Sequence, residues 1–189
     1  MKKRFLILLM LTLVLCLCAC GEPETDDREY AARQFLSQLL LDDAELQQAL
    51  LDNVTVIGEG VPAPTEEELA ERTEREAALT QMLHDRFDGL ASPELIDKNA
   101  TDGQLTYWQT MLAFKGAKVT VTDFGFLAPD KYGREVFEAT LHCVAGDEEA
   151  DLPLKGYLSF DEDGLIDSFH LYGEEGGFTG WLSGQENAV

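Results

Sequence analysis

Basic residues are scarce in this 189-residue chain, which holds 14 Lys and Arg against 36 Asp and Glu and has a formal net charge of −22. Nucleic-acid binding draws on patches of Lys and Arg that release counterions from phosphates. Such patches are missing from the sequence, so we expect no nucleic-acid partner. The acidic charge also predicts repulsion of the domain by anionic lipid, and it favours a solvated surface or cationic partners.

Motifs for catalysis and for metal binding are missing as well. The sequence contains no G-x-S-x-G, no H-E-x-x-H and no phosphate-binding glycine loop. The histidines, among them His142 and His170, do not have zinc-ligand spacing. The sequence therefore predicts no cofactor, no metal site and no set of catalytic residues.

Cysteine is nearly absent after residue 20, where Cys143 stands alone. One remaining cysteine excludes a disulfide within that part of the chain. Cys143 alternates with Phe137, Ala139 and Leu141, which places it on the apolar side of a strand. We therefore interpret it as a buried, inert thiol, with a catalytic nucleophile as the alternative.

The first 20 residues, MKKRFLILLMLTLVLCLCAC, combine a basic start with an unbroken apolar run. This pattern is typical of a secretory signal peptide. Its end, Leu17-Cys18-Ala19-Cys20, resembles a bacterial lipobox, with an apolar residue three positions before Cys20 and a small residue directly before it. The resemblance implies cleavage before Cys20, lipidation of Cys20, and anchoring on the extracytoplasmic face of the bacterial cell membrane. The alternative is a membrane anchor that is retained.

Cleavage at this point would leave 170 residues with a net charge of −25, because three basic residues lie in the leader. That length suits one domain with a sizeable core. The predicted boundaries are a signal peptide at 1–19, a lipidated tether at 20–29, a single domain at 30–175, and a glycine-rich tail at 176–189. Phe178 and Trp181 are expected to tuck back from this tail onto the domain.

Apolar residues recur with helical spacing in the first half of the chain. They predict an amphipathic helix from Tyr30 to about Leu50, bent near Asp42-Asp43. Thr65-Glu66-Glu67-Glu68 has the form of a capping box and predicts a second helix to about Phe87, whose packed face carries Leu69, Leu79, Met82, Leu83 and Phe87. Further helices are predicted after Ser92-Pro93 and around 105–112, and a short strand at 54–57.

After Gly116 the apolar period changes from about 3.6 to 2, which is typical of strands. Four strands are predicted near 119–121, 136–144, 152–160 and 165–172. The short links between them favour antiparallel neighbours. A run of helices followed by such strands predicts an α+β fold, with the helices on one face of a curved antiparallel sheet.

Two segments resemble a known superfamily. The start Ala32-Arg33-Gln34-Phe35-Leu36 and the closing hairpin from Tyr157 to Phe169 are similar to the first helix and last strands of NTF2-like (cystatin-like α+β) proteins. The resemblance implies a cone with a pocket between the helices and the concave face of the sheet. Some members use a pocket aspartate, or a histidine and aspartate pair, to move protons.

The strand alternation divides the predicted sheet into an apolar face and a polar face. The polar face carries His142, Tyr157, His170 and Tyr172. These residues are candidates for a surface that recognises an envelope protein or a small ligand, or for the seam of a homodimer. The alternative is that they form cross-strand pairs on a solvated face.

Two residues are candidates for lining a pocket. Asp167 is the one acidic residue that the alternation places on the apolar face, so an NTF2-like enzyme would use it as a general base. Trp108 could line a pocket for an apolar or sugar-like ligand, although aromatic residues at helical spacing usually belong to the core. The preferred interpretation is a lipid-anchored, non-enzymatic binding module, and the alternative is the pocket enzyme.

Overall fold

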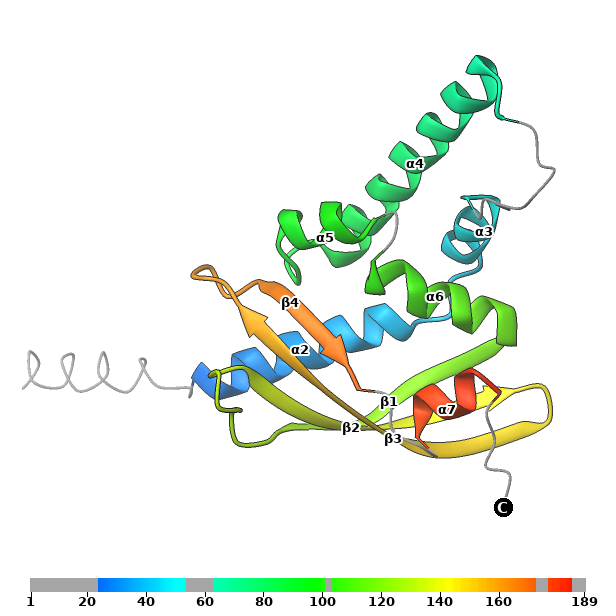
Figure 1. Ribbon diagram of the computed structural model, residues 1–189. Coiled ribbons are helices and arrows are strands. Elements are labelled where there is room, and N and C mark those ends of the chain that lie inside the picture. The colour runs from blue at the N-terminus through cyan, green and yellow to red at the C-terminus, as the bar shows by residue number, and fades with distance from the viewer. Residues whose placement is uncertain (1–23, 54–62, 101–102, 173–176, 185–189) are drawn as a thin grey trace, which may run out of the picture.

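The computed structural model describes residues 24–53, 63–100, 103–172 and 177–184 (Figure 1). Its elements are α2 (Glu24–Leu40), α3 (Ala44–Asn53), α4 (Glu66–Phe87), α5 (Pro93–Asn99), α6 (Gln104–Lys115), β1 (Ala117–Phe126), β2 (Glu135–Ala145), β3 (Glu148–Phe160), β4 (Ile166–Leu171) and α7 (Phe178–Leu182). The predicted α+β class is confirmed, and the arrangement is consistent with an NTF2-like layout. The leader, Cys20 and the strand predicted at 54–57 lie outside the described residues.

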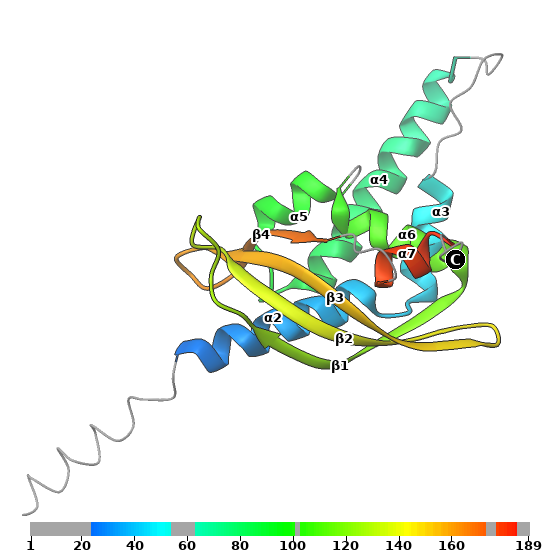
Figure 2. The same ribbon diagram turned by 60° about the horizontal axis from the view of Figure 1, so that its bottom comes forward.

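The four strands form an antiparallel meander in the order β1-β2-β3-β4. The helices gather on one side of this curved sheet, and β4 rises toward α5 (Figures 1 and 2). Strand alternation separates the two faces as predicted. The face toward the helices, here called the inner face, buries Phe137, Ala139, Leu141, Cys143, Leu154, Leu158, Phe169 and Leu171.

Helix α2 packs its apolar stripe against the inner face. Phe35 lies between the helices and the sheet, with its ring 5.2 Å from that of Phe87 on α4 and 5.1 Å from that of Phe169 on β4. Ala32, Leu36 and Leu39 continue the stripe at helical spacing and are also buried. This stripe joins the sheet to α4 in one core.

The bend predicted near Asp42-Asp43 is a break between two helices. The carboxylate of Asp43 accepts hydrogen bonds from the backbone N–H of Glu45 at 3.0 Å and of Leu46 at 3.1 Å, which starts α3. These contacts, the Leu46 bond first and the Arg86 guanidinium with it, hold the pKa of Asp43 below its usual value.

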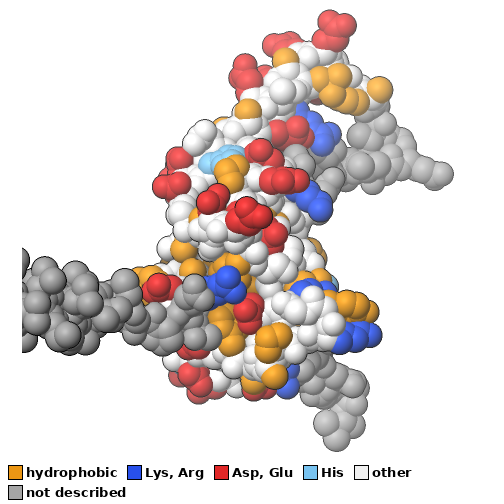
Figure 3. Space-filling view, turned by 90° about the vertical axis from the view of Figure 1, so that its left-hand side faces the viewer, with side chains coloured by type: hydrophobic (Ala, Val, Ile, Leu, Met, Phe, Trp, Pro, Cys, Tyr) orange, Lys and Arg blue, Asp and Glu red, His pale blue; other side chains and the backbone are white. Residues whose placement is uncertain are grey.

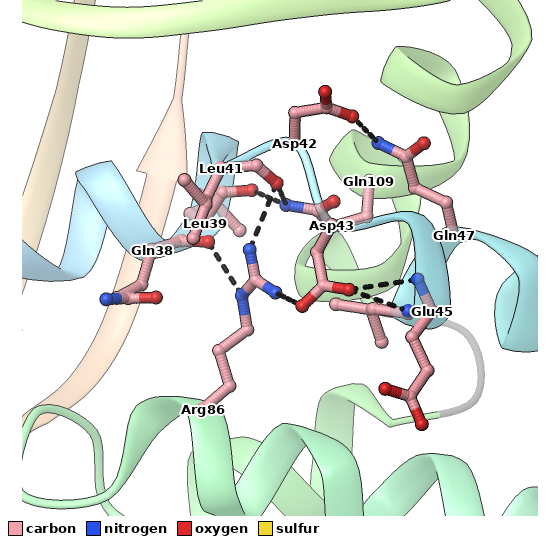
Figure 4. A network of polar contacts seen from close by, with 10 residues as sticks. Gln38, Leu39, Leu41, Asp42, Asp43, Glu45, Gln47, Arg86 and Gln109 are labelled. Atoms are coloured by element: carbon pink, nitrogen blue, oxygen red, sulfur yellow. Dashed lines mark hydrogen bonds and ion pairs between the residues drawn. The ribbon is translucent and has the colours of Figure 1, made fainter.

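Arg86, in the last turn of α4, joins this elbow to the rest of the domain (Figure 4). Its side chain is only 7% exposed. It donates to the carbonyl of Gln38 at 2.8 Å, to the carbonyl of Leu41 at 3.0 Å and to the Asp43 carboxylate at 2.8 Å. Gln109 of α6 donates to the carbonyl of Leu39 from the other side. One network therefore links α2, α3, α4 and α6.

The capping box predicted at Thr65 is present at the start of α4. Thr65 Oγ1 accepts from the Glu68 N–H at 3.2 Å, and the Glu68 carboxylate accepts from the Thr65 N–H at 2.7 Å. The first turns of the helix project away from the domain (Figure 1), and residues 63–75 are all exposed. Leu69 was predicted on the packed face but is 46% exposed, so that placement is wrong.

Helices extend beyond both predicted ends of the domain. Helix α2 begins at Glu24, inside the predicted tether, and α7 lies inside the predicted tail. The prediction that Phe178 and Trp181 pack back onto the domain is confirmed. Both are buried, and the Phe178 ring lies 6.0 Å from that of Trp108 on α6. Among the described helices, none has the length and apolar character needed to cross a membrane.

Candidate recognition surface

The side of the sheet that faces away from the helices is here called the outer face, and Figure 2 shows it toward the viewer. Its residues are half-buried or exposed. They include Val136, Glu138, Thr140 and His142 on β2, Lys155, Tyr157 and Ser159 on β3, and Ser168 and His170 on β4. Glu138 and Lys155 are cross-strand partners and form an ion pair at 2.9 Å, so charge on this part of the face is neutralised locally.

Three of the four predicted recognition residues meet on this face. Tyr157 and His170 are direct cross-strand partners with ring centroids 5.6 Å apart. The Tyr172 ring lies 6.1 Å from Tyr157 and 5.6 Å from His170. These separations are within the range where aromatic rings attract one another. The three residues are half-buried. They are called the aromatic cluster here, together with Arg134, whose guanidinium group stacks on the Tyr157 ring.

Arg134, which is not one of the four predicted recognition residues, stacks on this group. The guanidinium carbon lies 3.7 Å from the centroid of the Tyr157 ring. Asp130 holds the side chain in place by accepting from Arg134 Nε at 2.7 Å, and this contact raises the pKa of Arg134. The sequence did contain a signal for this position, because Arg134 precedes Val136 by two residues and strand alternation places both on the same face.

Gln104, the first residue of α6, fixes the His170 ring. Its Nε2 lies 2.9 Å from His170 Nδ1. The other amide atom, Oε1, is buried and has no hydrogen-bond partner among the residues that the structure describes. The two residues are 66 positions apart, so sequence patterns offered no signal for this contact.

His142 lies apart from the aromatic cluster. Its Nδ1 is 2.9 Å from the carboxylate of Asp151, which is its cross-strand partner, and its Nε2 is 3.7 Å from Glu149. Asp151 precedes Tyr157 by six residues on β3, or about 20 Å along the strand. His142 therefore fits the alternative interpretation, a cross-strand pair on a solvated face.

Asp167 does not face the core, so that prediction is wrong. Ser168 pairs with Ser159, but Ile166 pairs with Phe160, which leaves Asp167 as an extra residue in the ladder. This bulge turns Ile166 inward and Asp167 outward, where it is exposed. Strict alternation counted back from the buried Phe169 puts Asp167 on the inner face, because it does not allow for the extra residue. The general base of the enzyme alternative is therefore not enclosed.

Trp108 is a core residue. It is 7% exposed, and its ring packs against those of Tyr107 at 5.0 Å and Phe178 at 6.0 Å. Its indole N–H has no acceptor within the described part of the chain. Two open clefts among the described residues lie elsewhere, one of about 690 Å³ between α4 and α5 and one of about 420 Å³ beside the α2–α3 elbow. No sheet residue lines either of them.

Cys143 is fully buried, and burial raises its pKa to about 12. A thiol of this kind is a poor nucleophile at neutral pH. Within the described ranges, no group of three or more His, Cys, Asp or Glu side chains is placed to hold a metal ion. Comparison of the chain with protein-family models, curated proteins and solved structures found no match.

Proposed function

We propose that this protein is a lipid-anchored binding module on the extracytoplasmic face of the bacterial cell membrane, and that it recognises another envelope protein. The observation that carries the proposal is the half-buried aromatic cluster on the outer face. Tyrosine and arginine are enriched where protein interfaces concentrate their binding energy.

The contacts within the cluster support a recognition role. Arg134 is held by Asp130 and Tyr157, and His170 is held by Gln104. Side chains that are already ordered lose less conformational entropy when a partner binds. The excess of acidic residues in the chain as a whole disfavours acidic partners. The enzyme alternative has lost support, because Asp167 is exposed.

The anchor is tested by replacing Cys20 with alanine in cells. We expect Cys20→Ala to abolish lipidation and cleavage, because the thiol that would carry the diacylglycerol is gone. Metabolic labelling with a fatty-acid probe, together with membrane fractionation, measures both. Cys18→Ala is the matched control and should still be lipidated. Normal processing and labelling of Cys20→Ala would overturn the lipoprotein proposal.

The recognition surface is tested with the double change Tyr157→Ala and Tyr172→Ala. Loss of two aromatic contacts should weaken capture of the envelope partner at least about tenfold. Quantitative pull-down from envelope extract measures this, and Tyr107→Ala, an exposed tyrosine on α6, serves as the control. Light scattering tests the homodimer alternative in the same samples. Equal capture by parent and double variant, with both monomeric, would contradict a role for the cluster.

A further inference from the structure

The loop between β1 and β2, residues 127–134 with the sequence LAPDKYGR, presents apolar and aromatic side chains to solvent. Leu127 is 44% exposed and Tyr132 is 70% exposed, and Ala128 and Pro129 are exposed between them. Lys131 lies with its ammonium 4.8 Å from the centre of the Tyr132 ring. Tyrosine beside a long basic side chain is typical of the boundary between lipid headgroups and acyl chains.

The charge of this loop differs from that of the whole chain. Lys131 and Arg134 outnumber Asp130, which is itself paired with Arg134. The net charge of −25 that remains after cleavage repels the domain as a whole from anionic lipid, but the loop itself carries one net positive charge. The neighbouring β3–β4 turn is acidic, with Asp161, Glu162 and Asp163. A contact with lipid would consequently depend on Leu127 and Tyr132 more than on electrostatic attraction.

The loop lies at the end of the domain where the chain arrives from Cys20. Helix α2 begins at Glu24, four residues after Cys20, and four residues span at most about 14 Å. In the first turns of α2, Arg28 forms an ion pair with Glu135 at 3.4 Å and lies 5.4 Å from the Phe160 ring centre. Glu135 directly follows the loop, so the start of α2 and the loop share one end of the sheet (Figure 1).

Figure 3 shows this end of the molecule. Hydrophobic, basic and acidic side chains are interspersed in the lower half of the view, which the sheet end and α2 form. Acidic side chains are more frequent in the upper half, which α4 and α5 form. The lower half therefore has the larger share of hydrophobic side chains and the smaller share of acidic ones.

We infer that the 127–134 loop rests on the lipid bilayer, with Leu127 and Tyr132 at the level of the headgroups. The inference depends on the proposed lipidation of Cys20, because the short tether holds this end of the domain close to the surface. The loop is a second point of contact beside the acyl chains. Two points of contact restrict the tilt of the domain, and they favour orientations in which α4 extends away from the bilayer (Figure 1).

The test uses the full chain, lipidated in cells and reconstituted into vesicles of phosphatidylethanolamine and phosphatidylglycerol. Ala128→Cys places a reactive thiol in the loop without changing Leu127 or Tyr132, and Asp147→Cys places one in the β2–β3 turn. Cys143 is buried and stays unlabelled. Each thiol carries an environment-sensitive fluorophore, and lipids with a nitroxide near the headgroup act as quenchers.

We expect quenching at position 128 to be at least roughly twofold stronger than at position 147. Adding Leu127→Ser and Tyr132→Ser to Ala128→Cys should reduce quenching to the level seen at position 147. Equal, weak quenching at both positions in protein that floats with the vesicles would overturn the loop contact and leave the anchor intact. Strong quenching that survives the two serine changes would also overturn it. Protein that fails to float would refute the anchor and, with it, the inference.

Discussion

Replacing Arg86 with alanine should lower the free energy of unfolding by about 2–4 kcal/mol. The last carbonyls of a helix have no partner within the helix, and Arg86 donates to one of them, that of Gln38 in α2, and to the carbonyl of Leu41 just after the helix. It also neutralises Asp43, which starts α3. The expected loss is smaller than for a fully buried ion pair, because the side chain of Asp43 is 37% exposed and gains water when Arg86 is removed.

Urea unfolding followed by circular dichroism measures this loss. Arg72→Ala is the matched control, since Arg72 lies on the same helix with its side chain 48% exposed and pairs with Glu76 at 2.6 Å. Exposed pairs within one turn contribute little, so the control should lose less than about 1 kcal/mol. Equal urea midpoints for Arg86→Ala and the parent would show that the network in Figure 4 does not stabilise the elbow.

Local chemistry in the sequence was enough to predict several elements. The capping box at Thr65 and the Ser92-Pro93 start each depend on residues within one turn, and both occur where predicted. The strands followed from alternation, because a buried inner face and a hydrated outer face impose a period of two. Arg86 could not be placed this way, since its partners lie 43–48 residues earlier in the chain.

Periodicity failed where the regular pattern was interrupted or where an element had no neighbour. The bulge adds Asp167 as an extra residue in β4. Asp167 and Ile166 therefore face the opposite sides from those that strict alternation predicts. Leu69 matches a helical stripe, but the first turns of α4 extend beyond the core, so the stripe has nothing to cover there. A pattern in the sequence specifies which side of an element is apolar, and packing decides whether that side is buried.

The candidate site was predicted in part. Tyr157, His170 and Tyr172 came from alternation and hairpin pairing, which bring neighbouring strands into register. His142 was assigned to the same group because it shares the face, but sharing a face does not fix distance along a strand. Arg134 and Gln104 reach the cluster from outside the predicted strands.

The division of the sheet into two faces underlies the whole recognition surface, and Leu141→Ala tests it most directly. Leu141 is fully buried on β2, a central strand, between its cross-strand partners Val121 and Leu152. Removing its side chain beyond the Cβ should cost about 2–5 kcal/mol, through lost burial and the cavity that remains. We expect the upper half of this range, because hydrogen-bonded strands on both sides limit collapse of the cavity.

The matched control is Thr140→Ala, one residue earlier on the outer face and half-buried. It should cost less than about 1 kcal/mol in the same urea experiment. A slip of one residue in the register would exchange the two faces and make Thr140 the costly position. Urea midpoints in that reversed order would contradict the face assignment. With the two faces exchanged, Tyr157 and His170 would lie in the core. The predicted order, with Leu141 far the more costly, keeps the aromatic cluster on the surface where a partner can reach it.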